Sequence, residues 1–335
     1  MIWKSAELYN VAELVEEEGR GYAMLRYPKA VADGLSVQGQ AMNQCGSGTE
    51  IRFRIRSDSV RIRLSTGESA QTRACASAEV FYGDIAAGWT DCTKQIFETP
   101  TDIMIPPPEN MEALERIHAE HKMLFSPRLV RVVLPGAKIN IYEIEGDIEP
   151  PDPQDVPAKR FLAYGSSITF GSLCVPQAYT WVNRVAQNMG ADLINMGLAG
   201  SARLEKCAAD YIASRDDFDF ATLEMGINVM DLSDEEFERR VRYFISAIAG
   251  AHPDKIFFCM DVFFCYSDIL GDKKAAAYRQ IVRKVIGELK LPNTVYLDGS
   301  ALLTSSRGVC GDLTHPSIYG VEEITANLTA AMMQR

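Results

Sequence analysis

A proline-rich segment divides the chain into two halves with different sequence patterns. Residues 150–157 read Pro-Pro-Asp-Pro-Gln-Asp-Val-Pro, with four prolines in eight residues. Proline lacks the backbone N–H that a helix interior or a central strand needs, so neither element can run through this segment. The chain, at 335 residues, is also longer than one ordinary domain. We therefore predict a linker over residues 151–158, between an N-terminal domain (1–150) and a C-terminal domain (159–335).

The first half alternates apolar and polar residues with a period of two, which is typical of strands with one buried face. Residues 51–56 and 60–64 place arginines on one face, and residues 57–59 between them predict a hairpin turn. We predict an antiparallel β-sandwich, jelly-roll-like in arrangement, with these arginines on a solvated face. Further strands are predicted over residues 78–82, 94–97, 102–105, 129–134 and 138–145.

The second half alternates short apolar strands with amphipathic helical stretches. One of these helices begins with a capping box at Ser233. Five strands that alternate with helices predict a parallel sheet covered on both faces. Ligands of such sheets bind beyond the carboxyl ends of the strands. The strands are predicted over residues 160–164, 191–195, 218–224, 255–261 and 294–297.

The charge of the chain restricts the classes of partner that we expect it to bind. The net charge is −11 and both halves are acidic, so we expect no nucleic-acid partner and no anionic membrane surface, because both require a basic face. No apolar run reaches the length of about 18 residues that a membrane span needs. The N-terminal residues are acidic where a secretory signal would be apolar. The eight cysteines contain no CxxC pair and are expected to be reduced, so we expect a cytoplasmic protein.

The common motifs for nucleotide and metal chemistry are missing from the sequence. The chain contains no GxxxxGK[ST], GxGxxG, HExxH or GxSxG. His118 and His121 could face the same way on a helix, but residues 109–122 are strongly charged and no third ligand is evident. We therefore predict a surface helix there and not a zinc site.

Polar residues gather at the ends of the predicted strands, where the active site of a parallel sheet belongs. They offer a hydroxyl nucleophile, N–H donors and a histidine with a nearby carboxylate, which are the parts that acyl transfer requires. Each residue alone could be a cap, turn or loop residue, so the prediction depends on their conjunction. The residues are Ser166, Ser167, Gly197, Asn228, Asp312 and His315.

This set resembles the four sequence blocks of the SGNH hydrolases, also called the GDSL esterase family. The matches are Gly-Ser-Ser-Ile-Thr at 165–169, Gly197, Gly-Ile-Asn at 226–228, and Asp-x-x-His at 312–315. Aligned with the family's Gly-Asp-Ser, Ser166 replaces the aspartate, and Val229 replaces the second residue of Asn-Asp. The resemblance implies a flavodoxin-like three-layer α/β domain with strand order 2-1-3-4-5, and no cofactor or metal.

The resemblance also implies a role for each residue. Ser167 would be the nucleophile, His315 would take and return its proton, and Asp312 would hold the imidazole in its working tautomer. The oxyanion would be bound by the amides of Ser167 and Gly197 and by the side-chain amide of Asn228. Among the four histidines, only His315 has a carboxylate at this spacing next to a matching block.

The chain is also similar to two-domain SGNH proteins, including two-domain carbohydrate esterases. The similarity lies in the sequence Ala-Tyr-Gly-Ser-Ser-Ile-Thr at 163–169, the β-rich first half and the proline-rich linker. By analogy with these esterases, we expect hydrolysis of an ester of a small molecule or a carbohydrate. Because the sequence has no long apolar segment that resembles a lipase lid, we expect a short acyl chain, acetyl above all. The alternatives are an acyltransferase that uses the same serine, and a non-catalytic protein whose sandwich binds carbohydrate. Trp3, Tyr82 and Trp89 could stack on sugars, although such residues more often belong to the core or its edge. The sandwich could also join the subunits of a homo-oligomer.

Overall fold

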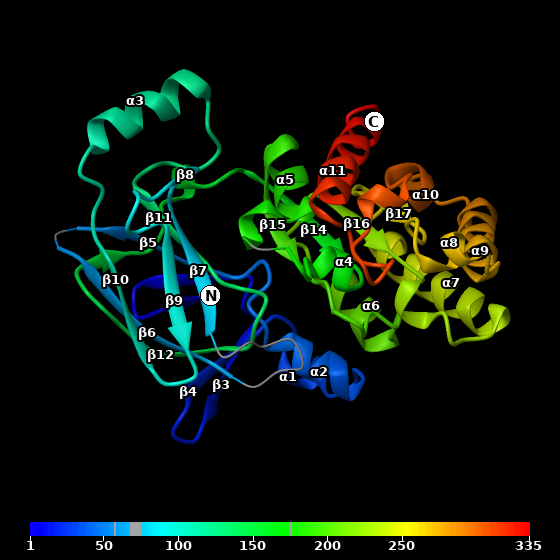
Figure 1. Ribbon diagram of the computed structural model, residues 1–335, viewed down its shortest axis with the longest axis horizontal. Coiled ribbons are helices and arrows are strands. Elements are labelled where there is room, and N and C mark those ends of the chain that lie inside the picture. Colours follow the sequence, from blue (N-terminus) through cyan, green and yellow to red (C-terminus); the bar gives the residue numbers. More distant parts are fainter. Residues whose placement is uncertain (57, 68–74, 175) are drawn as a thin grey trace.

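Two antiparallel sheets form the first half of the chain, and one parallel sheet forms the second half (Figure 1). The computed structural model describes residues 1–56, 58–67, 75–174 and 176–335. One antiparallel sheet has the order β1-β2-β5-β11-β7-β8, with β13 beside β5 and β9 beside β7, and the other has the order β10-β6-β12-β4-β3. The strands are β1 (Ile2–Trp3), β2 (Ala6–Tyr9), β3 (Glu13–Glu17), β4 (Gly21–Leu25), β5 (Glu50–Ile55), β6 (Val60–Thr66), β7 (Cys75–Tyr82), β8 (Ile85–Ala86), β9 (Thr93–Phe97), β10 (Thr101–Ile105), β11 (Leu129–Val133), β12 (Ile139–Glu145) and β13 (Ile148–Glu149).

The apolar positions of the alternating strands form the core between these two sheets. Ile51 and Phe53 of β5 are fully buried in it, and so are Ile62 and Leu64 of β6. However, β5 pairs with β2, β11 and β13, whereas β6 pairs with β10 and β12. The predicted hairpin is therefore wrong, and Ser57 lies outside the described residues. A strand shows the same alternation in either sheet, so the pattern could not reveal that the chain crosses between them.

The parallel sheet has the order β15-β14-β16-β17-β18, which confirms the predicted order 2-1-3-4-5. Phe161 and Ala163 of β14 face helices α5 and α11, whereas Leu162 and Tyr164 face α6, α7 and α9. The sheet is therefore covered on both faces. Its elements are β14 (Lys159–Tyr164), α4 (Ser167–Phe170), η2 (Gln177–Tyr179), α5 (Trp181–Asn188), β15 (Ala191–Asn195), α6 (Lys206–Ala213), β16 (Phe220–Glu224), η3 (Ile227–Val229), α7 (Asp234–Ala251), β17 (Ile256–Met260), α8 (Tyr266–Leu270), α9 (Lys274–Leu289), β18 (Thr294–Leu297), α10 (Gly299–Leu302), η4 (Ser306–Gly308) and α11 (Ile318–Met332).

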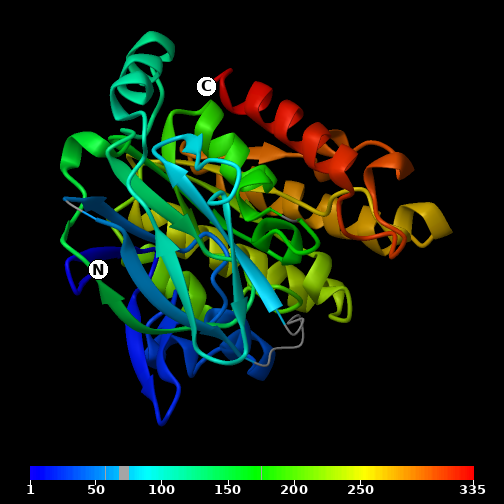
Figure 2. The same cartoon turned by 60° about the vertical axis from the view of Figure 1, so that its left-hand side comes forward.

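Four short helical elements accompany the sandwich and the linker. Helices α1 (Lys29–Ala32) and α2 (Val37–Asn43) lie beside the C-terminal half, whereas α3 (Met111–His121) stands out from the sandwich (Figures 1 and 2). Helix α3 has no buried residue, in agreement with the expected surface helix. The 3₁₀ turn η1 (Pro153–Asp155) lies in the proline-rich segment. No helix in the described part of the chain is long and apolar enough to cross a bilayer.

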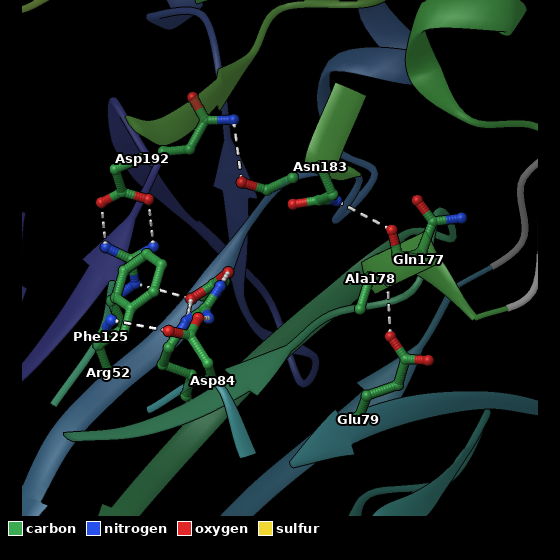
Figure 3. Close-up of polar contacts among 12 residues, drawn as sticks. Arg52, Glu79, Asp84, Phe125, Gln177, Ala178, Asn183 and Asp192 are labelled. Carbon is green, nitrogen blue, oxygen red and sulfur yellow. Dashed lines mark hydrogen bonds and ion pairs between the residues drawn. The ribbon is translucent and has the colours of Figure 1, made fainter. Parts of the chain in front are cut away.

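A buried ion-pair network joins the sandwich to the parallel sheet (Figure 3). Arg52 of β5 is 1% exposed, and its guanidinium donates two hydrogen bonds, of 2.6 and 2.8 Å, to the carboxylate of Asp192 in β15. The Arg52 Nε also donates to Glu50, which accepts two further bonds from Arg131. Burial alone would raise the pKa of Glu50, but the two arginines hold it at about 2. The predicted solvated face is therefore wrong for Arg52.

The position of Asp192 in the sequence explains why the prediction of a solvated Arg52 was wrong. Asp192 lies 140 positions away in the sequence, so the alternating pattern of β5 gives no sign of this partner. The arginines of β6 do remain on an exposed face, where Arg61 and Arg63 both pair with Asp102. A second contact between the halves joins the Glu79 carboxylate to the amide of Ala178, at 2.8 Å (Figure 3).

The buried network predicts a large loss of stability when one partner is removed. Arg52→Met leaves the carboxylates of Asp192 and Glu50 without a shared cation, and we expect it to lower the free energy of unfolding by about 3–5 kcal/mol. Arg63→Met is the control and should change stability little, because solvent screens its ion pair. Urea unfolding followed by tryptophan fluorescence measures both, and equal midpoints for the two variants would contradict the prediction.

Candidate active site

The turn after β14 carries both serines of the predicted motif. Ser166 is the N-cap of α4, and its Oγ accepts a hydrogen bond from the amide of Ile168 at 3.1 Å. Ser167 is the first residue of that helix and is 5% exposed. An amide in the first turn of a helix has no acceptor within the helix. The Ser167 N–H can therefore donate to a group that is bound in front of the helix.

The structure brings Ser167, His315 and Asp312 into one hydrogen-bonded chain. The Ser167 Oγ lies 2.7 Å from His315 Nε2, and His315 Nδ1 lies 2.6 Å from Asp312 Oδ2. The other carboxylate oxygen of Asp312 accepts the amides of Thr314 and His315. Burial alone would raise the pKa of Asp312, but these bonds hold it below its usual value. Asp312 is thus an anion placed against one edge of the imidazole, while the other edge faces the serine.

The two remaining predicted residues are placed differently from each other. Asn228 lies in η3, and its Oδ1 accepts the amide of Ala202 at 3.1 Å, so that its Nδ2 remains available to donate elsewhere. The amide of Gly197 instead donates to the side chain of Asn195 at 2.8 Å. The expected oxyanion role of Gly197 is not supported, because its single N–H is already used within its own loop.

Glu224 is a site residue to which the sequence analysis assigned no role. It ends β16 and is 2% exposed. Its Oε2 accepts the amide and hydroxyl of Ser166, at 2.7 and 2.9 Å, and the hydroxyl of Thr169 at 2.9 Å. Burial raises the pKa of Glu224, and these bonds oppose the rise. The family motif has an aspartate at position 166, and here the neighbouring strand supplies a carboxylate to the same turn. The replacement of that aspartate by Ser166 was therefore a signal in the sequence that a carboxylate for this turn comes from elsewhere in the chain.

The other three histidines of the sequence lie away from this chain of residues. His118 and His121 are on α3, and His252 follows α7. In the described part of the chain, no group of three or more His, Cys, Asp or Glu side chains is placed to hold a metal ion. Among the aromatic residues considered for sugar stacking, Tyr82 is buried, Trp3 packs on Tyr22, and Trp89 is 97% exposed.

Comparison with known proteins identifies the family. The model of the GDSL-like Lipase/Acylhydrolase family matches residues 158–331. The chain belongs to this family. The match contains the Ser167, Asn228 and Asp312-x-x-His315 blocks, and the resemblance to SGNH hydrolases is confirmed. No curated protein matches the chain.

Solved structures share the fold of this GDSL-like chain over both halves. The salicylyl-acyltransferase SsfX3 from a tetracycline biosynthetic pathway is 21% identical with a TM-score of 0.80, over 99% of this chain and 95% of that one. A putative GDSL-like lipase from Bacteroides ovatus is 17% identical with a TM-score of 0.73, over 98% and 97%. A family two carbohydrate esterase from Clostridium thermocellum is 13% identical with a TM-score of 0.59, over 87% and 93%.

The contact between Ser166 and Glu224 predicts that the family's own residue is harmful here. Ser166→Asp would place two carboxylates against each other in a buried turn, and we expect it to lower the free energy of unfolding by about 3 kcal/mol. Adding Glu224→Gln removes one of the two charges and should restore most of the loss. Thermal unfolding measures both variants. A single variant as stable as the wild type, or a double variant no better than the single one, would overturn this account.

Proposed function

We propose that this protein is a serine esterase that hydrolyses short-chain O-acyl esters, with acetyl esters of carbohydrates as the favoured class. The observation that carries the proposal is the continuous chain from Ser167 Oγ through His315 to Asp312. A serine hydroxyl is a poor nucleophile at neutral pH, and a histidine within hydrogen-bond distance supplies the base that it needs.

In the acylation step, Ser167 Oγ attacks the ester carbonyl carbon and its proton passes to His315 Nε2. The Asp312 carboxylate stabilises the imidazolium that forms. The Ser167 amide and the Asn228 side-chain amide donate to the carbonyl oxygen as it becomes an oxyanion. The tetrahedral intermediate then collapses, the bond to the leaving alcohol breaks, and that alcohol takes the proton from His315. The product of this step is an acyl ester on Ser167.

In the deacylation step, His315 takes a proton from water, and the resulting hydroxide attacks the acyl carbon. The bond to Ser167 Oγ breaks, the serine recovers its proton from His315, and the carboxylic acid leaves. An acyltransferase would form the same acyl-serine, with an acceptor alcohol in place of water. The two activities therefore share every residue named and differ only in the acceptor.

The substrate class rests on two supports of different kinds. The sequence contains no long apolar segment that resembles a lipase lid, which favours a short acyl chain. The carbohydrate part rests on analogy with the two-domain carbohydrate esterases that share the fold.

The serine assignment predicts opposite behaviour of two adjacent variants. Ser167→Ala should lower the rate of 4-nitrophenyl acetate hydrolysis by at least about 10³-fold, because the nucleophile is lost. Ser166→Ala is the matched control and should keep activity within about tenfold, because it loses only hydrogen bonds in the supporting turn. A serine-reactive phosphonate should label Ser167 in the wild type, as read by mass spectrometry.

Two outcomes would contradict this assignment. An active Ser167→Ala together with an inactive Ser166→Ala would reverse the roles of the two serines. A wild type that neither hydrolyses short esters nor reacts with the phosphonate would remove the esterase proposal. A panel of acetylated sugars, assayed with and without a competing acceptor alcohol, then separates hydrolysis from acyl transfer and identifies the preferred alcohol.

A further inference from the structure

The chain segment that begins at the last residue of β15 is held by side chains of the first half of the chain. This segment, the β15 loop (residues 195–200), contains Gly197 and lies against helix α4, because a Cβ on Gly197 would meet the Phe170 amide at 2.6 Å. Four of its main-chain carbonyls accept hydrogen bonds from the first half of the chain. The bonds are Asn10 Nδ2 and Arg26 Nη1 to Asn195 O at 2.9 and 3.0 Å, Tyr27 OH to Met196 O at 2.9 Å, Arg26 Nη1 to Gly197 O at 2.8 Å, and Gln38 Nε2 to Ala199 O at 3.1 Å.

Arg26 is the central donor of this set. It follows β4 directly and is 1% exposed. Besides its two bonds to the β15 loop, its Nε donates to Cys45 O at 3.1 Å and its Nη2 donates to Met42 O at 2.8 Å. Each of these four hydrogen bonds has a main-chain carbonyl, and not a carboxylate, as its acceptor. The guanidinium fork is thus used on main-chain carbonyls of both halves and not on a counter-ion.

The N–H groups of the same peptide bonds donate to the residues that lead into the turn of Ser166 and Ser167. The Leu198 amide, whose peptide carbonyl is the Gly197 oxygen held by Arg26, donates to Gly165 O at 2.8 Å. The Met196 amide, whose peptide carbonyl is the Asn195 oxygen, donates to Ala163 O at 2.8 Å. Each peptide plane therefore links Arg26 to the residues just before Ser166 and Ser167. A rotation of either plane would break one of these links.

We propose that Arg26 is a positioning residue for the reaction, and that through it the N-terminal sandwich holds the β15 loop in register with the nucleophile turn. The inference rests on the proposed esterase function and adds to it a role for the first half of the chain. Lysine cannot replace Arg26, because its single nitrogen cannot reach carbonyls on opposite sides as a planar fork does. The group acts through the loop and touches no reacting atom.

The test compares two buried arginines that both join the halves of the chain. Arg26→Lys and Arg52→Lys each keep the charge and lose the fork, but only Arg26 binds the β15 loop. In the full-length protein we expect both to lower the melting temperature. Only Arg26→Lys should lower kcat for 4-nitrophenyl acetate, by about 10- to 100-fold with KM within about twofold, because a small misplacement near the reacting groups costs that much. The rate of phosphonate labelling should fall in parallel.

A second pair decides the matter if the lysine variants fold poorly. Tyr27→Phe removes the hydroxyl that binds Met196 O, and Tyr82→Phe removes a partly buried hydroxyl that binds Pro106 O within the first half of the chain at 2.7 Å. We expect kcat to fall about threefold or more for Tyr27→Phe, the loss expected for one hydrogen bond, and to stay unchanged for Tyr82→Phe.

Three results would count against the inference. Wild-type kcat in Arg26→Lys, or an equal loss of kcat in Arg52→Lys, would reduce Arg26 to a structural residue and leave the esterase function intact. If the lysine variants do not fold, equal kcat in Tyr27→Phe and Tyr82→Phe has the same meaning. A wild type that is inactive towards esters and the phosphonate would instead remove the proposed function, and this inference with it.

Discussion

The main-chain carbonyl groups at the end of β15 need hydrogen-bond donors, and contact between the two halves of the chain supplies them. A strand that stops at the edge of a sheet leaves carbonyls without a ladder partner, and a buried unpaired polar group costs about 1–3 kcal/mol. Here the donors come from the other half of the chain, chiefly Arg26 and Tyr27. Tyr27 and Met42 also belong to the hydrophobic core that underlies the parallel sheet. The edge that carries the candidate active site therefore depends on the sandwich for hydrogen bonds and for packing.

In the loop that carries His315, the carboxylate of Asp312 has two functions. One oxygen of Asp312 accepts the amides of Thr314 and His315 and so closes the turn, while the other accepts from the imidazole. The three-residue spacing allows this double use, because it places both the imidazole and the amide of His315 within reach of the Asp312 side chain. Glu224 has a similar function in the turn after β14, because its carboxylate accepts hydrogen bonds from Ser166 and Thr169 on either side of Ser167.

The features that could be predicted from the sequence are those with a local signal. The strands of the parallel sheet follow from short apolar runs between amphipathic helices, and Asp312 and His315 are close in sequence as well as in space. The features that escaped depend on partners far away in the chain. Arg52 and Asp192 are 140 positions apart, and Arg26 and Gly197 are 171. The use of the Gly197 amide by Asn195 also escaped, although an asparagine side chain often accepts the amide two residues further on.

Recognition of main-chain oxygens has a consequence for how such a protein can diverge. The hydrogen bonds that Arg26, Tyr27 and Gln38 donate to this loop go to its backbone carbonyls and not to its side chains. Substitutions of Met196, Leu198 or Ala199 that fit the available space would leave this grip unchanged. The buried side chains of this loop can thus change, within the limits of core packing, while the hydrogen bonds to its main chain stay in place. Exchange of the sandwich for an unrelated domain would remove these donors and leave the carbonyls of the loop unpaired.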